Sequence, residues 1–148
     1  MDRILVGLDA SPRAEDVLET AVELARRTGG RLILFRAVGV PHEIPVEAYT
    51  MTPASLADLL EREAKSYLER ITSALPAGLV LETVVGVGTP WQAICAAADH
   101  HKAEIILIGS HGYSGLDRLI GTTAGKVVNH ATQSVLVVRG RPRFTPAA

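Results

Sequence analysis

Apolar runs of strand length alternate with amphipathic segments along the chain, and this alternation limits the fold more than any other sequence feature. The runs are nearly continuous in apolar residues, which is typical of strands buried on both faces of a parallel sheet. Strands are expected at Arg3 to Asp9, Arg31 to Val38, Leu79 to Gly86, Glu104 to Ser110 and Ser134 to Val138. Helices are expected between them, the first with Ser11 as N-cap and Pro12 at its first position, then Ala54 to Leu75, Thr89 to His101 and about Gly121 to Ala131.

This order predicts an α/β fold with a five-stranded parallel sheet and helices on both faces. A chain of 148 residues fits one domain, which we expect to span residues 1–140. Residues 141–148 are expected to form a flexible C-terminal tail. The arginines of "RGRPRF" (139–144) then lie mostly in a solvated terminus, with an anion or partner contact as the alternative. The proline-containing stretch 39–53 predicts a long loop.

Composition excludes several classes of function. The formal net charge of −1 argues against a broad basic face for nucleic acid. The apolar run in "MDRILVGLDASP" is short and interrupted by Asp, so it fits neither a signal peptide nor a membrane span, and a cytoplasmic protein without a membrane partner is expected. Cys95 is the only cysteine, which excludes an intramolecular disulfide and favours a buried, inert thiol.

Ligands in parallel α/β folds bind beyond the carboxyl ends of strands where the strand order reverses. Asp9, Ala37, Val38 and the segment Gly109 to Gly112 occupy such ends. The segment 121–127, "GTTAGKV", is too short between its glycines for a P-loop and lacks the hydroxyl after Lys126. "GVGTPW" (86–91) has Trp91 where a dinucleotide fingerprint needs its third glycine, so Gly86 and Gly88 are interpreted as turn residues and Thr89 as a helix cap.

The stretch from Ile108 to Val128, "IGSHGYSGLDRLIGTTAGKVV", differs from these motifs. Its first glycines follow a predicted parallel strand, and Gly121 precedes a predicted helix. Glycines let backbone N–H groups converge, and a helix start supplies unpaired donors with partial positive charge. The stretch therefore favours phosphate binding, while a simple connecting turn remains the alternative.

Four segments together resemble the universal stress protein family over nearly the whole chain. They are "ILVGLDASPRAEDVLETAVELA", "GTPWQAICAAA", "EIILIGSHGYSGLDRLIGTTAGKVVNHA" and "SVLVVR". The resemblance implies a Rossmann-like fold of the adenine nucleotide alpha hydrolase-like type and a homodimer formed through the last strand, Ser134 to Val138. In one branch of the family it also implies ATP binding through G-x-x-G, nine residues and G-[ST].

Transferred to this sequence, the motif assigns phosphate contacts to two short segments. These are Gly109, Ser110, His111 and Gly112, and then Gly121, Thr122 and Thr123. The spacer from Tyr113 to Ile120 has eight residues instead of nine. The resemblance further implies that Asp9 faces the nucleotide, that the Ala37 backbone contacts adenine, and that Gly7 lines the cleft.

The leading hypothesis is a cytoplasmic, homodimeric stress-response protein that binds ATP, with Mg²⁺ accompanying the nucleotide, as a ligand. No paired carboxylates suited to acid–base catalysis are evident at one strand end, and His100, His101 and His130 are interpreted as structural. No metal held by protein ligands alone and no redox cofactor is expected. One alternative is a dimeric interaction module of the same family that binds no nucleotide. A slow ATPase is the other.

Overall fold

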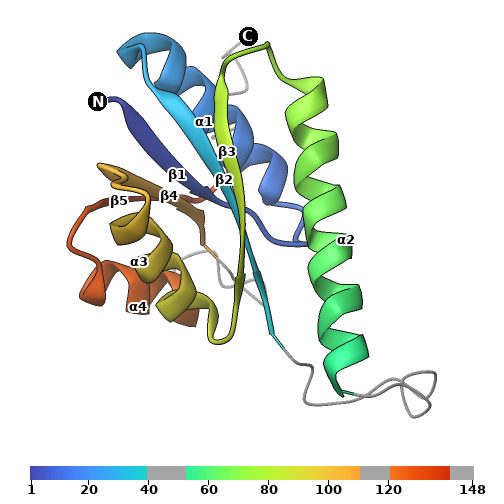
Figure 1. The fold of residues 1–148 in the computed structure, drawn as a ribbon. Coiled ribbons are helices and arrows are strands. Elements are labelled where there is room, and N and C mark those ends of the chain that lie inside the picture. Colours follow the sequence, from blue (N-terminus) through green and yellow to red (C-terminus); the bar gives the residue numbers. More distant parts are fainter. Residues whose placement is uncertain (40–52, 111–120, 141–148) are drawn as a thin grey trace, which may run out of the picture.

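The computed structural model describes residues 1–39, 53–110 and 121–140, which form five strands and four helices in strict alternation (Figure 1). The strands are β1 (Arg3–Gly7), β2 (Arg31–Val38), β3 (Val80–Val87), β4 (Ile105–Gly109) and β5 (Ser134–Val138). The helices are α1 (Ala14–Thr28), α2 (Pro53–Ala74), α3 (Pro90–His100) and α4 (Thr122–His130). The predicted spacer and C-terminal tail, and nearly all of the predicted long loop, lie outside the described residues.

The five strands form one parallel sheet in the order β3-β2-β1-β4-β5. The chain builds the sheet outward in one direction from β1 to β3, then returns to the other side of β1 for β4 and β5. The order therefore reverses between β1 and β4. The predicted fold class, a five-stranded parallel α/β domain, is confirmed.

Helices cover both faces of the sheet (Figure 1). Alternate residues of the central strands face opposite sides, so that Leu34 packs in the cluster with α1 and α2, and Phe35 packs in the cluster with α3 and α4. The two clusters are almost wholly aliphatic. This burial on both sides explains why the strands have continuous apolar runs in the sequence.

The first helix begins later than the sequence predicts. Arg13 occupies the N-cap position and α1 starts at Ala14, so the prediction of Ser11 as N-cap is wrong. Asp9 Oδ1 instead accepts a hydrogen bond from Ser11 N–H at 2.8 Å, and Ser11 C=O accepts one from Ala14 N–H at 3.1 Å. The Asp side chain thus holds residues 9–11 in a tight turn, which competes with an earlier helix start.

Gly86 and Gly88 have different roles, although the sequence predicts a turn at both. Gly88 has a φ of 117° and leaves β3 in a turn. Gly86 lies inside β3, where an added Cβ would come 2.7 Å from Cζ of Phe35 and 3.1 Å from Cβ of Ala93. Glycine at position 86 therefore makes room for the Phe35 ring.

Two apolar residues of the helices are exposed to solvent. Leu59 on α2 is 38% exposed and Val128 on α4 is 46% exposed, whereas Ala64 and Val127 on the same helices are buried. Val128 lies at the margin of the apolar stripe of α4, whereas Leu59 lies away from the face of α2 that buries Ala64 and Leu68. Within the described residues, no helix has the length and apolar composition needed to cross a membrane.

Candidate functional site

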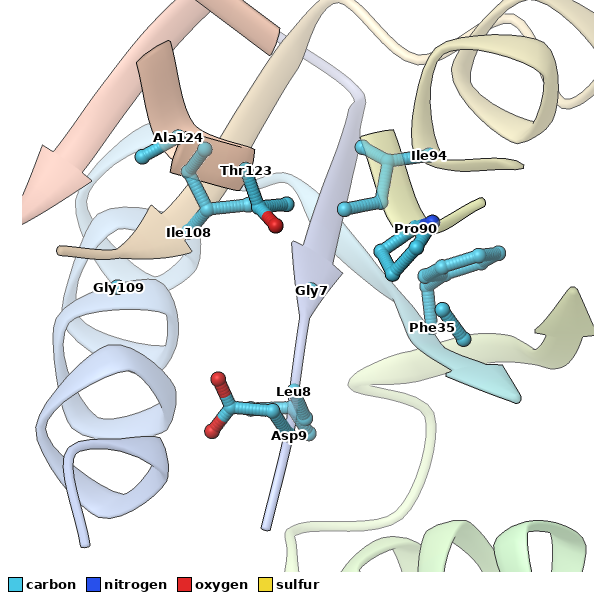
Figure 2. A pocket seen from close by; sticks show the side chains of 11 residues that line it. Gly7, Leu8, Asp9, Phe35, Pro90, Ile94, Ile108, Gly109, Thr123 and Ala124 are labelled. Carbon is cyan, nitrogen blue, oxygen red and sulfur yellow. The ribbon is translucent and has the colours of Figure 1, made fainter. Parts of the chain in front are cut away.

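A pocket of about 150 Å³ opens at the carboxyl ends of β1, β2 and β4, where the strand order reverses (Figure 2). Helices α3 and α4 close it on one side. This is the place at which parallel α/β folds usually bind ligands. The lining residues are Gly7, Leu8, Asp9, Phe35, Ala37, Pro90, Ile94, Ile108, Gly109, Thr123 and Ala124.

The structure brings five of the predicted site residues together around this pocket, namely Gly7, Asp9, Ala37, Gly109 and Thr123. Gly121 and Thr122 do not line it, but they are the N-cap and first residue of α4, directly before Thr123. The predicted contacts His111 and Gly112 lie outside the described residues.

Ser110, another predicted contact, is buried beside the pocket without lining it. Its N–H donates to Val138 C=O at 2.9 Å, which extends the pairing of β4 with β5. Its Oγ accepts a hydrogen bond from Arg13 Nη1 at 3.2 Å, and the same nitrogen donates to Arg139 C=O at 2.7 Å. These contacts tie the Ser110 side chain to the start of α1 and the end of β5.

Glycine at position 7 keeps the pocket open. A Cβ atom on Gly7 would lie 2.9 Å from Cγ2 of Ile108 and 3.8 Å from Cδ1 of Ile94, two side chains of the pocket wall. A Cβ on Gly109 would instead point toward Cγ2 of Val17 in α1, at 3.2 Å. Gly109 therefore lines the pocket with its backbone, while its missing side chain allows α1 to approach β4.

The backbone of Ala37 faces the pocket because β2 is longer than β1. Pairing between the two strands ends at Gly7 and Phe35, and Phe35 C=O accepts the next bond from Leu8 N–H at 2.8 Å. On the opposite edge of β2, Val38 C=O accepts from Gly88 N–H at 3.0 Å. Peptide groups alternate between the two edges of a parallel strand, so those of Ala37 point to the β1 side, beyond the last β1 pair.

Two helices begin at the pocket. Pro90 and Ile94 come from the first turns of α3, and Thr123 and Ala124 from the first turn of α4. The first N–H groups of a helix lack intrahelical acceptors and carry partial positive charge. The Thr89 side chain forms no capping bond at α3, and the N-cap residue of α4 is Gly121, which has no side chain that could cap the helix. The two helix starts therefore give this side of the pocket a field that favours anions.

Asp9 supplies the one carboxylate of the pocket lining among the described residues. Figure 2 shows its carboxylate turned away from Phe35, toward the side where Gly109 lies. Its backbone C=O accepts a hydrogen bond from the Tyr67 hydroxyl at 3.5 Å. Burial raises the pKa of that hydroxyl, with the Asp9 charge adding to the shift and Arg36 opposing it, so Tyr67 stays a neutral donor at physiological pH.

The sequence did not single out the apolar members of the lining. Leu8, Phe35, Pro90, Ile94, Ile108 and Ala124 all carry apolar side chains. Most of them are also core residues, so hydrophobic periodicity marks them only as buried. Their proximity to Asp9 and Ala37 follows from strand order. The sequence does indicate where Pro90 and Ile94 lie, because a helix that follows a parallel strand begins at the carboxyl ends of the strands, where the pocket is.

Titratable groups elsewhere form structural contacts. His101 Nδ1 lies 2.8 Å from Glu82 Oε1, and the His130 ring stacks on Trp91 with 4.4 Å between centroids. Cys95 is partly buried, less enclosed than the sequence predicts, and burial with the nearby Asp99 charge raises the pKa of its thiol. Among residues 1–39, 53–110 and 121–140, no three His, Cys, Asp or Glu side chains group as metal ligands.

Comparison with known proteins places this architecture in one family. The universal stress protein family pattern matches residues 1–139. Universal stress protein A homolog 2 of Coxiella burnetii is 30% identical over 93% of this chain and 94% of its own. The structure of UspA from Lactobacillus plantarum superposes with a TM-score of 0.75 at 26% identity, covering 93% of this chain and 97% of that one. A universal stress protein in complex with cAMP superposes with a TM-score of 0.62 at 25% identity, covering 95% and 98%. This chain belongs to the universal stress protein family.

Proposed function

We propose that the pocket between β1, β2, β4 and the starts of α3 and α4 binds an adenine nucleotide, with ATP and its Mg²⁺ as the ligand. The observation that carries this proposal is the convergence of Gly7, Asp9, Ala37, Gly109 and Thr123 on one pocket at the strand-order reversal. The family relative solved with cAMP supports an adenine nucleotide as the class of ligand.

The base is expected in the apolar part of the pocket. Phe35, Pro90 and Ile94 offer apolar surfaces for a flat ring. The Ala37 peptide groups supply a donor and an acceptor that can pair with the edge of adenine. The volume of about 150 Å³ is below the usual range of about 300–1,000 Å³ for small-molecule pockets. The pocket therefore holds the base, and the rest of the nucleotide extends out of it.

The phosphates are expected at the α4 start, near Thr123, rather than beside Asp9. A carboxylate repels phosphate, whereas the N–H groups of a helix start attract it. Asp9 is then suited to accept hydrogen bonds from the sugar hydroxyls. The proposed phosphate contacts are Gly109, His111, Gly112, Gly121, Thr122 and Thr123, whereas the N–H and Oγ of Ser110 are already bonded to Val138 and Arg13.

Thermal unfolding with increasing Mg-ATP tests the proposal. Ligand at a hundredfold excess over its dissociation constant stabilises the folded state by about 2.7 kcal/mol. We expect the midpoint to rise with Mg-ATP, and parallel titrations with ADP, AMP and cAMP establish which adenylate binds most tightly. If none of the four raises the midpoint at millimolar concentration, the proposal fails and the nucleotide-independent interaction module becomes the better account.

We also propose that the protein acts as a cytoplasmic homodimer joined through β5. Among the described strands, β5 pairs only with β4 and lies at the edge of the sheet, and its Leu136 side chain is 39% exposed. An edge strand with exposed apolar side chains favours pairing with a second copy. Light scattering at micromolar concentration should give the mass of two chains, and a monomer mass would contradict this assembly.

A further inference from the structure

A basic groove of about 410 Å³ lies between β2 and α2. Consecutive residues of a strand face opposite sides of a sheet, so Arg36 points toward this groove and Ala37 toward the nucleotide pocket. The groove is lined by Arg36, Arg62, Glu63, Ser66, Tyr67 and Arg70. Arg62, Ser66 and Arg70 are four residues apart on α2, which places them along one face of the helix.

The groove has an excess of positive charge. Its three arginines are accompanied by one carboxylate, that of Glu63. Throughout the described ranges, no carboxylate forms an ion pair with Arg36, Arg62 or Arg70. By contrast, Arg27 on α1 pairs with Glu23 one turn away at 2.6 Å. The cations of the groove are therefore available to an external anion.

Arg36 is held in place without a carboxylate. Its guanidinium carbon lies 4.4 Å from the centroid of the Tyr67 ring, a cation–π contact. The Tyr67 hydroxyl donates to Asp9 C=O at 3.5 Å, which fixes the ring against the end of β1. This arrangement positions one cation in advance, so less side-chain entropy is lost when an anion binds.

We propose that this groove binds a phosphate group, either free phosphate or the monoester of a small molecule. Arginine presents a planar fork of donors that matches phosphate oxygens, and Ser66 adds a hydroxyl donor. Three guanidinium groups and one carboxylate leave two positive charges, close to the charge of about −1.5 to −2 on a phosphate monoester at pH 7. This site is separate from the proposed nucleotide pocket and does not depend on it.

Calorimetric titration of the full chain with sodium phosphate and, in parallel, glycerol phosphate tests the site. The variant Arg62→Gln/Arg70→Gln should weaken binding at least tenfold, because it removes two of the three cations. Both side chains are exposed, so the variant should fold normally. Lys65→Gln is a single-charge control, since it removes one positive charge from an exposed position of the same helix outside the groove. It should bind like the unaltered chain.

The two titrations and the two variants distinguish a specific phosphate site from a general effect of surface charge. Tighter binding of glycerol phosphate than of phosphate would identify a monoester ligand, and equal binding would identify free phosphate. The arginine variant should retain its response to Mg-ATP, so failure of either proposal can be recognised without the other. The inference is overturned if millimolar phosphate compounds do not bind, if Arg62→Gln/Arg70→Gln binds them unchanged, or if Lys65→Gln weakens binding equally.

Discussion

Gly7 and Ile108 are so close across β1 and β4 that a Cβ atom on Gly7 would lie 2.9 Å from Ile108 Cγ2. Both residues line the proposed nucleotide pocket, so the Gly7→Ala variant should reduce its volume. We expect nucleotide affinity to fall about tenfold or more, and the free energy of unfolding to fall by about 1–3 kcal/mol from overpacking. Calorimetry with Mg-ATP and urea unfolding measure the two effects.

Gly30→Ala is the matched control for this change. Its added Cβ would meet Met1 C=O at 2.7 Å, a comparable overlap at the start of β2, at the opposite end of the strands from the pocket. This variant should also lose stability, but its affinity for nucleotide should be unchanged. Equal losses of affinity in both variants would show that the Gly7 effect comes from general destabilisation.

The Ala37 backbone provides a second test of the pocket. Proline at this position removes the N–H group that faces the β1 side, whereas the bonds from β2 to β3 involve the neighbouring residues. Ala37→Pro should therefore weaken adenine nucleotide binding at least tenfold and leave the sheet intact by circular dichroism. Ala37→Ser keeps the N–H and should bind nearly normally. Unaltered affinity in Ala37→Pro would exclude this N–H from base recognition.

Cys95 should react slowly with thiol reagents in the folded protein. Its pKa is raised by burial and, to a lesser extent, by the Asp99 carboxylate, and the thiolate is the reactive form. Because Cys95 is the only cysteine, labelling with a chromogenic disulfide follows this site alone. At about pH 8 the labelling rate of Cys95 should rise when the protein is unfolded in urea. The folded Asp99→Asn variant should be labelled modestly faster than the folded unaltered chain. Labelling of the folded chain as fast as the unfolded chain would contradict this environment.

Tyr67 should make the stability depend on pH in the alkaline range. Burial raises the pKa of its hydroxyl above the ordinary value of 10.0, so the folded chain keeps this proton where the unfolded chain loses it. The resulting stabilisation is complete below pH 10.0 and is lost as the pH rises through the folded-state pKa. Between about pH 9 and about pH 11, the free energy of unfolding measured in urea should fall less for Tyr67→Phe than for the unaltered chain. An identical decline in both proteins would exclude this contribution.

The sequence predicts the strands and their parallel arrangement well because each strand is buried on both faces and leaves a continuous apolar run. β2 and β5 begin and end where the apolar pattern predicts, at Arg31–Val38 and Ser134–Val138. Helix starts are less predictable, since a single side-chain contact can decide them. The bond from Ser11 N–H to Asp9 Oδ1 delays α1 in a way that capping preference alone does not reveal.

The candidate site was predictable where it depends on strand ends and less so where it depends on packing. Asp9 and Gly109 follow from the rule that ligands bind at the carboxyl ends of parallel strands. The contact between Gly86 and the Phe35 ring requires knowing that β3 lies beside β2. For Ser110 the sequence predicts too much: its place in a glycine-rich motif indicates a ligand contact, but its hydrogen bonds are to Arg13 and Val138.

A crystal structure of the protein grown with saturating Mg-ATP is the decisive test of nucleotide binding in this pocket. We predict density for adenine between Phe35 and Pro90, with its edge paired to the Ala37 backbone, and density for phosphates at the start of α4 by Thr123. An empty pocket at saturating nucleotide, or a nucleotide bound elsewhere on the molecule, would contradict this prediction.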